Sequence, residues 1–323
     1  MSKYILGIDA GGTKTHGALA DENGSILALV SNSGANWERY GIAAAQQTLT
    51  AVVRDLLQQT EIAGHEVGSA TFALAGIDWP QDLDLFNGFT ESLSFGGPTS
   101  IINDSFAALY AGVPSGIGAI SIAGTGGKTA VSNGLESLQT MGMELGEGGG
   151  GGELISLAVE KAAQNFHRGV TTSKLTQLLL NNARCETPLD FFYEVARNGL
   201  RMNETLAPAI FALANQGDEE SVSIVARVAR HHAEDVIALC DRIQFQVPVT
   251  VVRAGGLHTA GNSIFDSSFE DSLKAATFKY ELVRLEISPS YGSVIHAGID
   301  FFKGLNSNFS NRVIDEARKR EGL

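Results

Sequence analysis

Short apolar runs separated by glycine and polar positions dominate the first hundred residues, a pattern typical of strands joined by tight turns. Three such runs come first, and a stretch with apolar residues at helical spacing follows them. The predicted elements are strands at 4–8, 15–20 and 26–30, a helix at 43–59, a strand at 67–75, a helix from about 80, a strand at 100–103 and a helix through 107–109. This order, βββαβαβ, predicts an α/β domain.

The same order begins again after residue 115, where an apolar strand, a glycine turn and a second strand follow one another. Several helices interrupt this second unit before its strands resume. The repeated elements are strands at 119–122 and 128–132 around a turn at 124–127, helices between about 153 and 244, and strands at 249–252 and 281–285. We therefore predict two similar domains, 1–115 and 116–323, with the ligand in a cleft between them. The last helix can pack back on the first domain.

Composition narrows the classes of partner. The chain has 323 residues, 44% of them hydrophobic, which is enough for two cores. A formal net charge of -13 with 23 thinly spread basic residues argues against nucleic acid as a partner. Cys185 and Cys240 lie far apart in helix-like stretches and form no C-x-x-C pair, so we expect buried thiols rather than a disulfide or metal framework. Without a leader or an 18-residue apolar run, we expect a cytoplasmic protein with no membrane partner.

The first motif with chemical content joins the first two predicted strands. Adjacent Gly11 and Gly12 let the backbone turn tightly and bring its N–H groups against an anion. Asp9 can face a hydrated divalent cation, while Thr13 and Lys14 can donate to phosphate oxygens. A plain hairpin turn explains the same glycines, so a phosphate site and a structural turn stay open at this point.

A second glycine turn, Gly124-Thr125-Gly126-Gly127, lies at the corresponding place in the second unit. The segment Gly127-Lys128-Thr129 matches the end of a Walker A motif, but the glycine expected five residues earlier is Ile122, and a strand rather than a helix follows. The pattern therefore predicts a second hairpin whose amides and Thr125 hydroxyl can hold a phosphate.

Asp104 follows the strand that ends at Asn103, at the carboxyl edge where an α/β sheet presents ligands. An N-cap of the next helix is the simplest role for this aspartate. If two phosphate-binding hairpins flank one cleft, a carboxylate there suits a base that accepts the proton of an attacking hydroxyl.

Two further loops have the residue types of a sugar site. Asn36 and Trp37 can bind a sugar by hydrogen bonds and ring stacking, although Trp37 also suits a core position. Five consecutive glycines, residues 148–152, follow Glu147 and precede a helix. Because such a run keeps much backbone freedom, we expect the loop from Gly146 to Gly152 to be mobile without ligand and to let a ligand approach the backbone. Glu147 can accept bonds from sugar hydroxyls or remain a solvated carboxylate.

Glycines also mark the starts of two late helices, at Gly255-Gly256 and at Tyr291-Gly292. Flat glycine backbone there can lie against a purine ring or can allow close helix packing. His258, His296 and the pair His231-His232 have no metal-ligand spacing, so structural roles are expected for them.

Taken in order, these motifs resemble the nucleotide and connecting motifs of the superfamily of actin, the heat-shock chaperone ATPases and hexokinase. Within it the chain is similar to the N-acetylglucosamine kinase and glucosamine kinase group, which shares a family with the activator ATPases of benzoyl-CoA reductase and 2-hydroxyacyl-CoA dehydratase. The motifs that carry the resemblance are Gly7-Ile8-Asp9-Ala10-Gly11-Gly12-Thr13-Lys14, Ile102-Asn103-Asp104, Ile122-Ala123-Gly124-Thr125-Gly126, Ala254-Gly255-Gly256 and Tyr291-Gly292.

The resemblance implies an α/β fold of two ribonuclease H-like, actin/hexokinase-type domains around an interdomain cleft. It also implies a kinase that uses ATP and Mg2+ to phosphorylate an amino sugar or related hexose, in a homodimer. Asp104 would be the catalytic base. The other residues implied are Asp9, Gly11, Gly12, Thr13, Lys14, Thr125, Gly126, Gly127, Gly255 and Gly256 for nucleotide, with Asp9 on Mg2+ through water, and Asn36, Trp37, Ala75, Gly76, Gly142 and Glu147 for sugar.

Two departures from that group affect the sugar site. Amino-sugar kinases usually carry Trp-Gly and then Gly-Asp-Glu-Gly-Ser in one loop, where this chain has Met141-Gly142 and then Gly146-Glu147-Gly148. The stacking Trp and the sugar-binding Asp are both replaced, which leaves recognition of an N-acetyl group open.

Other classes fit the sequence less well. An activator ATPase needs a cysteine-bound iron–sulfur cluster at a dimer interface, which Cys185 and Cys240 do not supply, and zinc-containing sugar kinases carry a cysteine-rich cluster. A non-catalytic, nucleotide-dependent conformational protein would keep the hairpins but have no use for Asp104. The sequence therefore favours the kinase.

Overall fold

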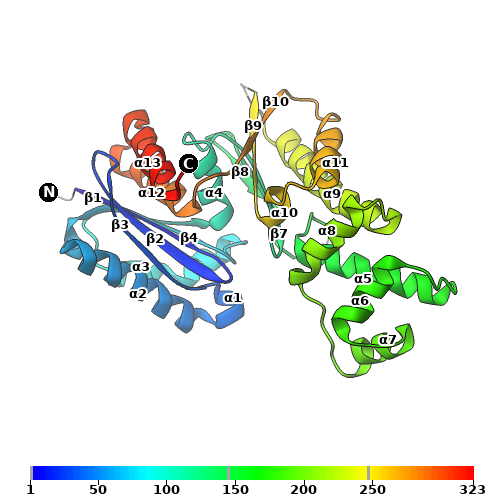
Figure 1. Ribbon diagram of the computed structural model, residues 1–323. Helices are drawn as coiled ribbons and strands as arrows, with labels where there is room; N and C mark the ends of the chain where they lie inside the picture. The colour runs from blue at the N-terminus through cyan, green and yellow to red at the C-terminus, as the bar shows by residue number, and fades with distance from the viewer. Residues whose placement is uncertain (1–2, 144–145, 246–247) are drawn as a thin grey trace.

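The computed structural model describes residues 3–143, 146–245 and 248–323 as two five-stranded sheets with helices around them (Figure 1). The strand orders are β3-β2-β1-β4-β5 and β10-β9-β6-β7-β8. In each sheet, three consecutive strands pair antiparallel and two later strands add in parallel on the other side of the first one. The predicted duplication of one βββαβαβ unit is confirmed.

The N-terminal sheet forms from alternating apolar segments that end in turn residues, as predicted. A 3-10 segment begins at Pro80, and a short α-helix follows it. The elements are β1 (Tyr4–Ala10), β2 (Lys14–Asp21), β3 (Ile26–Ser33), α1 (Trp37–Tyr40), α2 (Ile42–Thr60), η1 (Gly64–Glu66), β4 (Val67–Leu74), η2 (Pro80–Leu85), α3 (Asn87–Ser92), β5 (Thr99–Asn103) and α4 (Asp104–Gly112).

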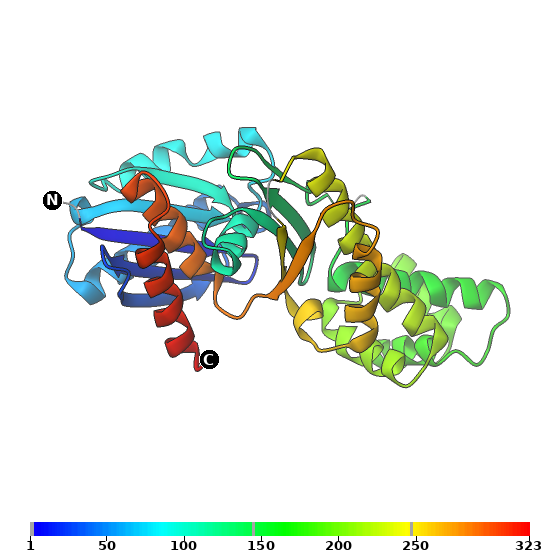
Figure 2. The same ribbon diagram turned by 90° about the horizontal axis from the view of Figure 1, so that it is seen from above.

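Two glycines let helices lie close on opposite faces of this sheet. A Cβ at Gly17 would come within 2.5 Å of Val52 on α2, and a Cβ at Gly7 within 2.3 Å of the Val294 backbone nitrogen on α12 (Pro289–Phe302). Figures 1 and 2 both show α12 and α13 (Ser307–Glu321), in red, against the N-terminal strands. The end of the chain thus returns to the N-terminal sheet.

The C-terminal sheet carries the predicted helical insertion between its third and fourth strands. Helices α5, α6 and α7 form the end of the molecule farthest from the N-terminal sheet (Figures 1 and 2). The elements are β6 (Gly118–Ala123), β7 (Gly127–Ser132), β8 (Ser137–Gln139), α5 (Gly151–His167), α6 (Lys174–Ala183), α7 (Pro188–Arg197), η3 (Glu204–Leu206), α8 (Ala207–Asn215), α9 (Glu219–Arg242), β9 (Val249–Ala254), α10 (Gly256–Thr259), α11 (Ser263–Leu273) and β10 (Tyr280–Arg284).

The two cysteines differ from each other in setting. Cys240 is buried on the apolar face of α9, as predicted. Cys185 lies outside any helix, so the prediction for it is wrong: α6 ends at Ala183, and the left-handed backbone of its C-cap, Arg184 (φ 57°), turns the chain away. Cys185 is only half-buried in the turn that follows.

Helix α4 is the packing element between the two sheets. On one side Gly292 of α12 comes so close that a Cβ there would lie 1.9 Å from the carbonyl oxygen of Ala107. On the other side Leu109 packs with Ile120 of β6 and Val252 of β9 in one buried cluster. The N-terminus of α4 is therefore held between both halves of the chain, and Asp104 is its first residue. The domain limits at residues 115 and 116, which fall between α4 and β6, stay a prediction.

Candidate active site

The first glycine turn, residues 10–14, is a tight hairpin between β1 and β2. The amide of Gly11 donates to the carbonyl oxygen of Lys14 (2.9 Å), which closes the turn. The carbonyl of Gly12 accepts a hydrogen bond from the Tyr40 hydroxyl (2.9 Å), while a Cβ added at Gly12 would meet no atom within 4 Å. Thr13 and Lys14 are exposed. The Tyr40 hydrogen bond thus holds one side of the turn, and the side toward which a Gly12 side chain would point is open.

The second glycine turn, residues 124–127, is covered by the five glycines at 148–152, here called the glycine run. The amide of Gly151 donates to the Gly124 carbonyl (2.8 Å), and the amide of Gly152 to the Thr125 carbonyl (2.9 Å). A Cβ at Gly127 would lie 1.8 Å from the Gly148 carbonyl oxygen. Glycine is needed at these positions because the backbone of the glycine run packs directly on the backbone of the second glycine turn. The tip, Thr125 and Gly126, stays exposed.

The glycine run is held on its other side by carboxylates. Gly148 donates its amide to Asp235 Oδ2 (2.7 Å), and Gly149 donates its amide to Glu153 Oε2 (2.8 Å). The Gly149 carbonyl lies 2.7 Å from His232 Nε2. The backbone groups of the run thus bond to the second glycine turn and to side chains of α5 and α9, contacts that the sequence did not suggest, and its mobility without ligand stays a prediction. Glu147, which precedes it, is half-buried and its charge helps to raise the pKa of Asp235 to about 6, after the larger effect of burial.

Asn103, not Asp104, caps helix α4. The Asn103 side-chain oxygen accepts from the amide of Ser105 (3.0 Å), so the simplest alternative role for Asp104 is already filled by its neighbour. Burial raises the pKa of Asp104 to about 6, against the lowering effect of the Lys128 ammonium and backbone N–H groups at the helix N-terminus, while Asp78 raises it. A carboxylate that titrates near neutral pH suits a general base.

Asp9, on β1, and Asp104, directly after β5, both lie at the carboxyl edge of the N-terminal sheet, where β4 separates their two parallel strands. Burial, and then the Asp104 charge, raise the pKa of Asp9 to about 8. Two carboxylates facing each other in a desolvated place are stabilised by a divalent cation, so Asp9 fits a Mg2+ held through water and phosphate oxygens. Within residues 3–143, 146–245 and 248–323, no three His, Cys, Asp or Glu side chains are gathered to hold a metal alone.

Four of the predicted sugar residues, Asn36, Trp37, Ala75 and Gly76, lie together near the first glycine turn. Asn36 caps α1, and the Trp37 indole N–H donates to the Gly76 carbonyl (2.8 Å). Ala75 donates its amide to the Ala10 carbonyl (2.9 Å), which ties the loop after β4 to the first glycine turn. The Trp37 ring packs partly buried against the N-terminal core, so it anchors this loop, and its contact with a sugar stays a prediction.

Sequence reasoning missed an ion pair at the centre of the site. Lys128 Nζ lies 2.6 Å from Asp78 Oδ1, and both side chains are about nine-tenths buried at 11% and 12% exposure. Gly142, predicted to bind sugar, lies against the same pair: a Cβ there would be 3.0 Å from Asp78 Oδ2. Glu38 also faces this group, and partial desolvation and then Asp78 raise its pKa. A lysine inside an apolar strand was the available signal, because a lysine is rarely buried without a partner.

The glycines at the starts of the two late helices, Gly255, Gly256 and Gly292, have different roles. Gly255 has a φ of +88°, and a Cβ there would lie 2.5 Å from Ala123, so it allows β9 to pass the second glycine turn. Gly256 starts α10 and faces open space. Gly292 instead serves the helix packing against α4 described above. Of the two alternatives for Tyr291-Gly292, close helix packing is the one that the structure shows.

The histidines form buried structural contacts. Ser121 Oγ lies 3.1 Å from His232 Nδ1 and 3.0 Å from His258 Nε2. Burial lowers the pKa of His232 to about 4 and also lowers that of His258, so both rings are neutral at physiological pH. His296 bonds to Thr71 at 2.9 Å.

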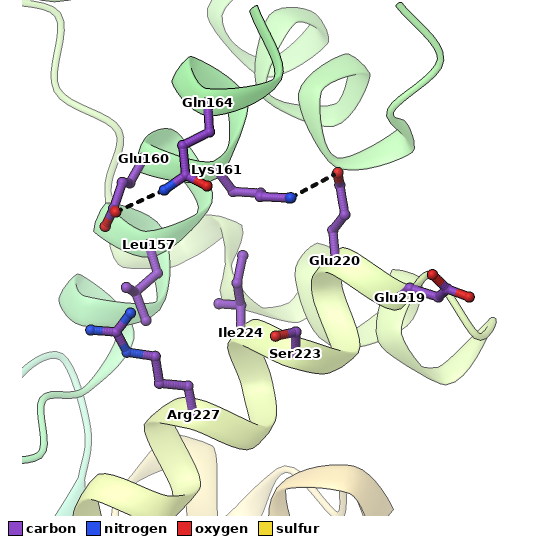
Figure 3. Close-up of a pocket in the computed structure, with 9 residues that line it drawn as sticks. All are labelled: Leu157, Glu160, Lys161, Gln164, Glu219, Glu220, Ser223, Ile224 and Arg227. Atoms are coloured by element: carbon purple, nitrogen blue, oxygen red, sulfur yellow. Dashed lines mark hydrogen bonds and ion pairs between the residues drawn. The ribbon is translucent and has the colours of Figure 1, made fainter. Parts of the chain in front are cut away.

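Of two pockets in the structure, one lies apart from the site and the other borders it. A pocket of about 460 Å3 between α5 and α9 (Figure 3) is lined by polar side chains that pair with one another: Lys161 forms an ion pair with Glu220, and Gln164 donates a hydrogen bond to Glu160. Its lining contains none of the site residues. A second pocket, of about 540 Å3, is mainly apolar and is lined in part by Asp78, Asn103 and Gln139, so it adjoins the ion pair.

The fold and the edge between the two glycine turns define a class of protein: an ATPase-type fold of duplicated α/β domains, as in actin and hexokinase. A solved chain from Chromobacterium violaceum shares the fold with a TM-score of 0.65 and 20% identity over 91% of this chain and 98% of that one. The ROK family glucokinase of Streptomyces griseus, solved with glucose and AMPPNP, matches with a TM-score of 0.52 and 18% identity over 92% of this chain and 99% of its own.

The chain belongs to the BadF/BadG/BcrA/BcrD ATPase family, whose pattern matches residues 6–297. Among characterised relatives, the N-acetylmuramic acid/N-acetylglucosamine kinase of Clostridium acetobutylicum is 24% identical over 307 residues, 91% of this chain and 98% of the relative. The N-acetyl-D-glucosamine kinase of Dictyostelium discoideum is 31% identical over 251 residues, 71% of this chain and 77% of the relative. Among the described residues, no helix combines the length and the apolar character that a bilayer crossing needs.

Proposed function

We propose that this protein is an ATP-dependent kinase that transfers the γ-phosphoryl group to a hydroxyl of an amino sugar of the N-acetylglucosamine or glucosamine type. The observation that carries the proposal is the position of Asp104: a carboxylate with its pKa raised to about 6, at the edge between two glycine turns and beside Asp9. The kinases among its relatives support the substrate class.

In this mechanism the two glycine turns hold the nucleotide. Thr13 and the exposed Thr125 donate to phosphate oxygens, and the open face of Gly12 lets a phosphate approach the backbone. Gly256 leaves space at the start of α10, next to Gly255, for the adenosine. Mg2+, when bound at Asp9, would neutralise charge on the phosphates.

On the acceptor side, Asp104 takes the proton of the sugar hydroxyl that attacks the γ-phosphorus. Since its carboxylate sits in a desolvated place, its basicity is matched to neutral pH. Asn36, Gly76 and Glu147 hold the sugar hydroxyls so that the reacting oxygen lies in line with the bond between the γ-phosphorus and the oxygen that leaves with ADP. Binding of Mg2+, assembly as a homodimer and a cytoplasmic location belong to the same proposal.

A coupled assay of ADP release tests this proposal directly. The purified protein is given ATP and Mg2+ with glucosamine, N-acetylglucosamine, N-acetylmuramic acid, mannosamine and glucose, each in a separate reaction. Sugar-dependent ADP release, with the phosphorylated sugar identified by mass spectrometry, is the expected result. ADP release that no sugar of the panel accelerates would count against the kinase and favour an ATPase.

A further inference from the structure

The Lys128–Asp78 ion pair joins the two halves of the molecule inside the site. Lys128 belongs to β7 of the C-terminal sheet and directly follows the second glycine turn. Asp78 lies in the loop after β4 of the N-terminal sheet, and the two atoms Nζ and Oδ1 are 2.6 Å apart. Gln139 of β8 adds hydrogen bonds from Nε2 to the carbonyls of Ile77 and Asp78, both 3.2 Å.

The same Asp78 oxygen reaches the helix of the base. Asn103 Nδ2 donates to Asp78 Oδ1 (3.0 Å) and to the Ile77 carbonyl (3.1 Å). The other end of the Asn103 side chain caps α4 through the amide and hydroxyl of Ser105 (3.0 and 2.5 Å). Asp104 is the residue between them. A continuous chain of short polar contacts therefore runs from the second glycine turn to the first turn of α4.

We propose that Lys128 is a positioning residue: through Asp78 and Asn103 it fixes the helix that carries Asp104 relative to the turn that holds the phosphates. The inference rests on the kinase proposed above, in which donor and base come from different halves of the chain. A displacement of about 1 Å between reacting groups costs on the order of a hundredfold in rate, so a rigid tie between these halves has a direct effect on turnover.

Several carboxylates surround the Lys128–Asp78 ion pair, so the arrangement depends on the Lys128 charge. Glu38, Asp78, Asp104 and Asp9 contribute to the acidic surroundings, and Lys128 is the cation that acts on Glu38 and on Asp104. A buried pair that loses one partner leaves an uncompensated charge. Removal of Lys128 would let the carboxylates repel one another and the loop after β4 move away from Asn103.

The test is a kinetic comparison of Lys128→Met, Lys128→Arg, Asp78→Asn and the double variant Lys128→Met/Asp78→Asn. We expect Lys128→Met to lower kcat by roughly tenfold to a hundredfold, while the Kd for ATP, measured by calorimetry, changes by less than about threefold. Lys128→Arg should recover most of the loss, and the double variant should lose no more than Lys128→Met alone, because both single changes break one contact. Lys161→Met, which breaks a surface pair with Glu220 in the pocket of Figure 3, is the matched control and should keep the wild-type kcat.

Three outcomes overturn the inference. A folded Lys128→Met protein with wild-type kcat would do so, as would a variant that loses only affinity for ATP. If Lys128→Met does not fold, the double variant decides, since it contains no unpaired charge, and a wild-type kcat there refutes the positioning role. Failure of the proposed function looks different, because then the wild-type protein itself phosphorylates no sugar.

Discussion

The two glycine turns are alike in sequence and different in what surrounds them. At the first turn the space next to Gly12 contains no protein atom within 4 Å, whereas at the second turn a Cβ on Gly127 would come within 1.8 Å of the Gly148 carbonyl. A glycine can thus leave room for a ligand or room for the protein's own backbone. The comparison teaches that glycine content alone does not identify the ligand-facing position, and that the second turn is a supported platform with only Thr125 and Gly126 exposed.

The substitution with the largest expected effect on kcat tests whether both glycine turns serve one reaction. Asp104→Asn should lower kcat by about a hundredfold or more, because an amide can orient the sugar hydroxyl but cannot accept its proton. The fold and the affinity for ATP should persist, since Asn103 supplies the helix cap. Steady-state kinetics with calorimetry measures both, and Asp271→Asn on the exposed face of α11 is the control.

The same aspartate sets a pH dependence. Its pKa is raised to about 6 by burial, and the base works only when ionised, so kcat/KM should be constant above neutral pH and fall as the pH drops through about 6. A flat profile between pH 5 and 8, or near-wild-type turnover by a folded Asp104→Asn protein, would remove the base assignment and leave the two turns without a common reaction.

A matched pair of alanine substitutions separates the open turn from the covered one. Gly127→Ala places a methyl group on the Gly148 backbone and should destabilise the protein by about 1 to 3 kcal/mol, lowering Tm by several degrees. Gly12→Ala meets open space, so Tm should stay within about a degree while the KM for ATP rises by about tenfold, because the methyl occupies space that a phosphate needs.

Thermal unfolding and ATP kinetics on the two variants give the answer. If Gly12→Ala destabilises as much as Gly127→Ala, the first turn is only a structural hairpin. If Gly127→Ala melts like the wild type, the glycine run does not cover the second turn as described.

The order of strands and helices along the chain was predictable because its signals are local. Alternating apolar positions and turn residues such as those at 124–127 identify strands without knowledge of their partners, and the repeated order then implied the second sheet. The cap of α4 was assigned one residue late, since Asn103 and Asp104 have similar capping chemistry and only the backbone geometry distinguishes them.

What sequence reasoning missed depends on contacts between distant segments. The glycine run suggested flexibility because its partner, the second glycine turn, lies more than twenty positions earlier and pattern gives no distance between them. Lys128 and Asp78 are 50 positions apart, and each alone resembles an ordinary charged residue. Roles for Asn36, Gly142 and Glu147 came from family resemblance, and they stay predictions.

The smallest expected effect concerns the glycine run and Glu147. Glu147→Ala should raise the KM for the sugar by about three- to tenfold, which corresponds to the net contribution of about one ordinary hydrogen bond, and leave kcat and Tm nearly unchanged. Since the run is already bonded to Asp235, Glu153 and the second glycine turn, Glu147 is not needed to order it.

If the sugar draws the two halves together, small-angle scattering should show the same decrease in radius of gyration for the wild type and for Glu147→Ala at saturating sugar. Glu160→Ala, in the separate pocket of Figure 3, is the control for the kinetics. An unchanged sugar KM would remove Glu147 from the sugar site. A decrease in radius of gyration that disappears in Glu147→Ala would show that the glycine run becomes ordered only when the sugar binds. The contrast between a covered and an open glycine turn would then hold only for the sugar-bound state.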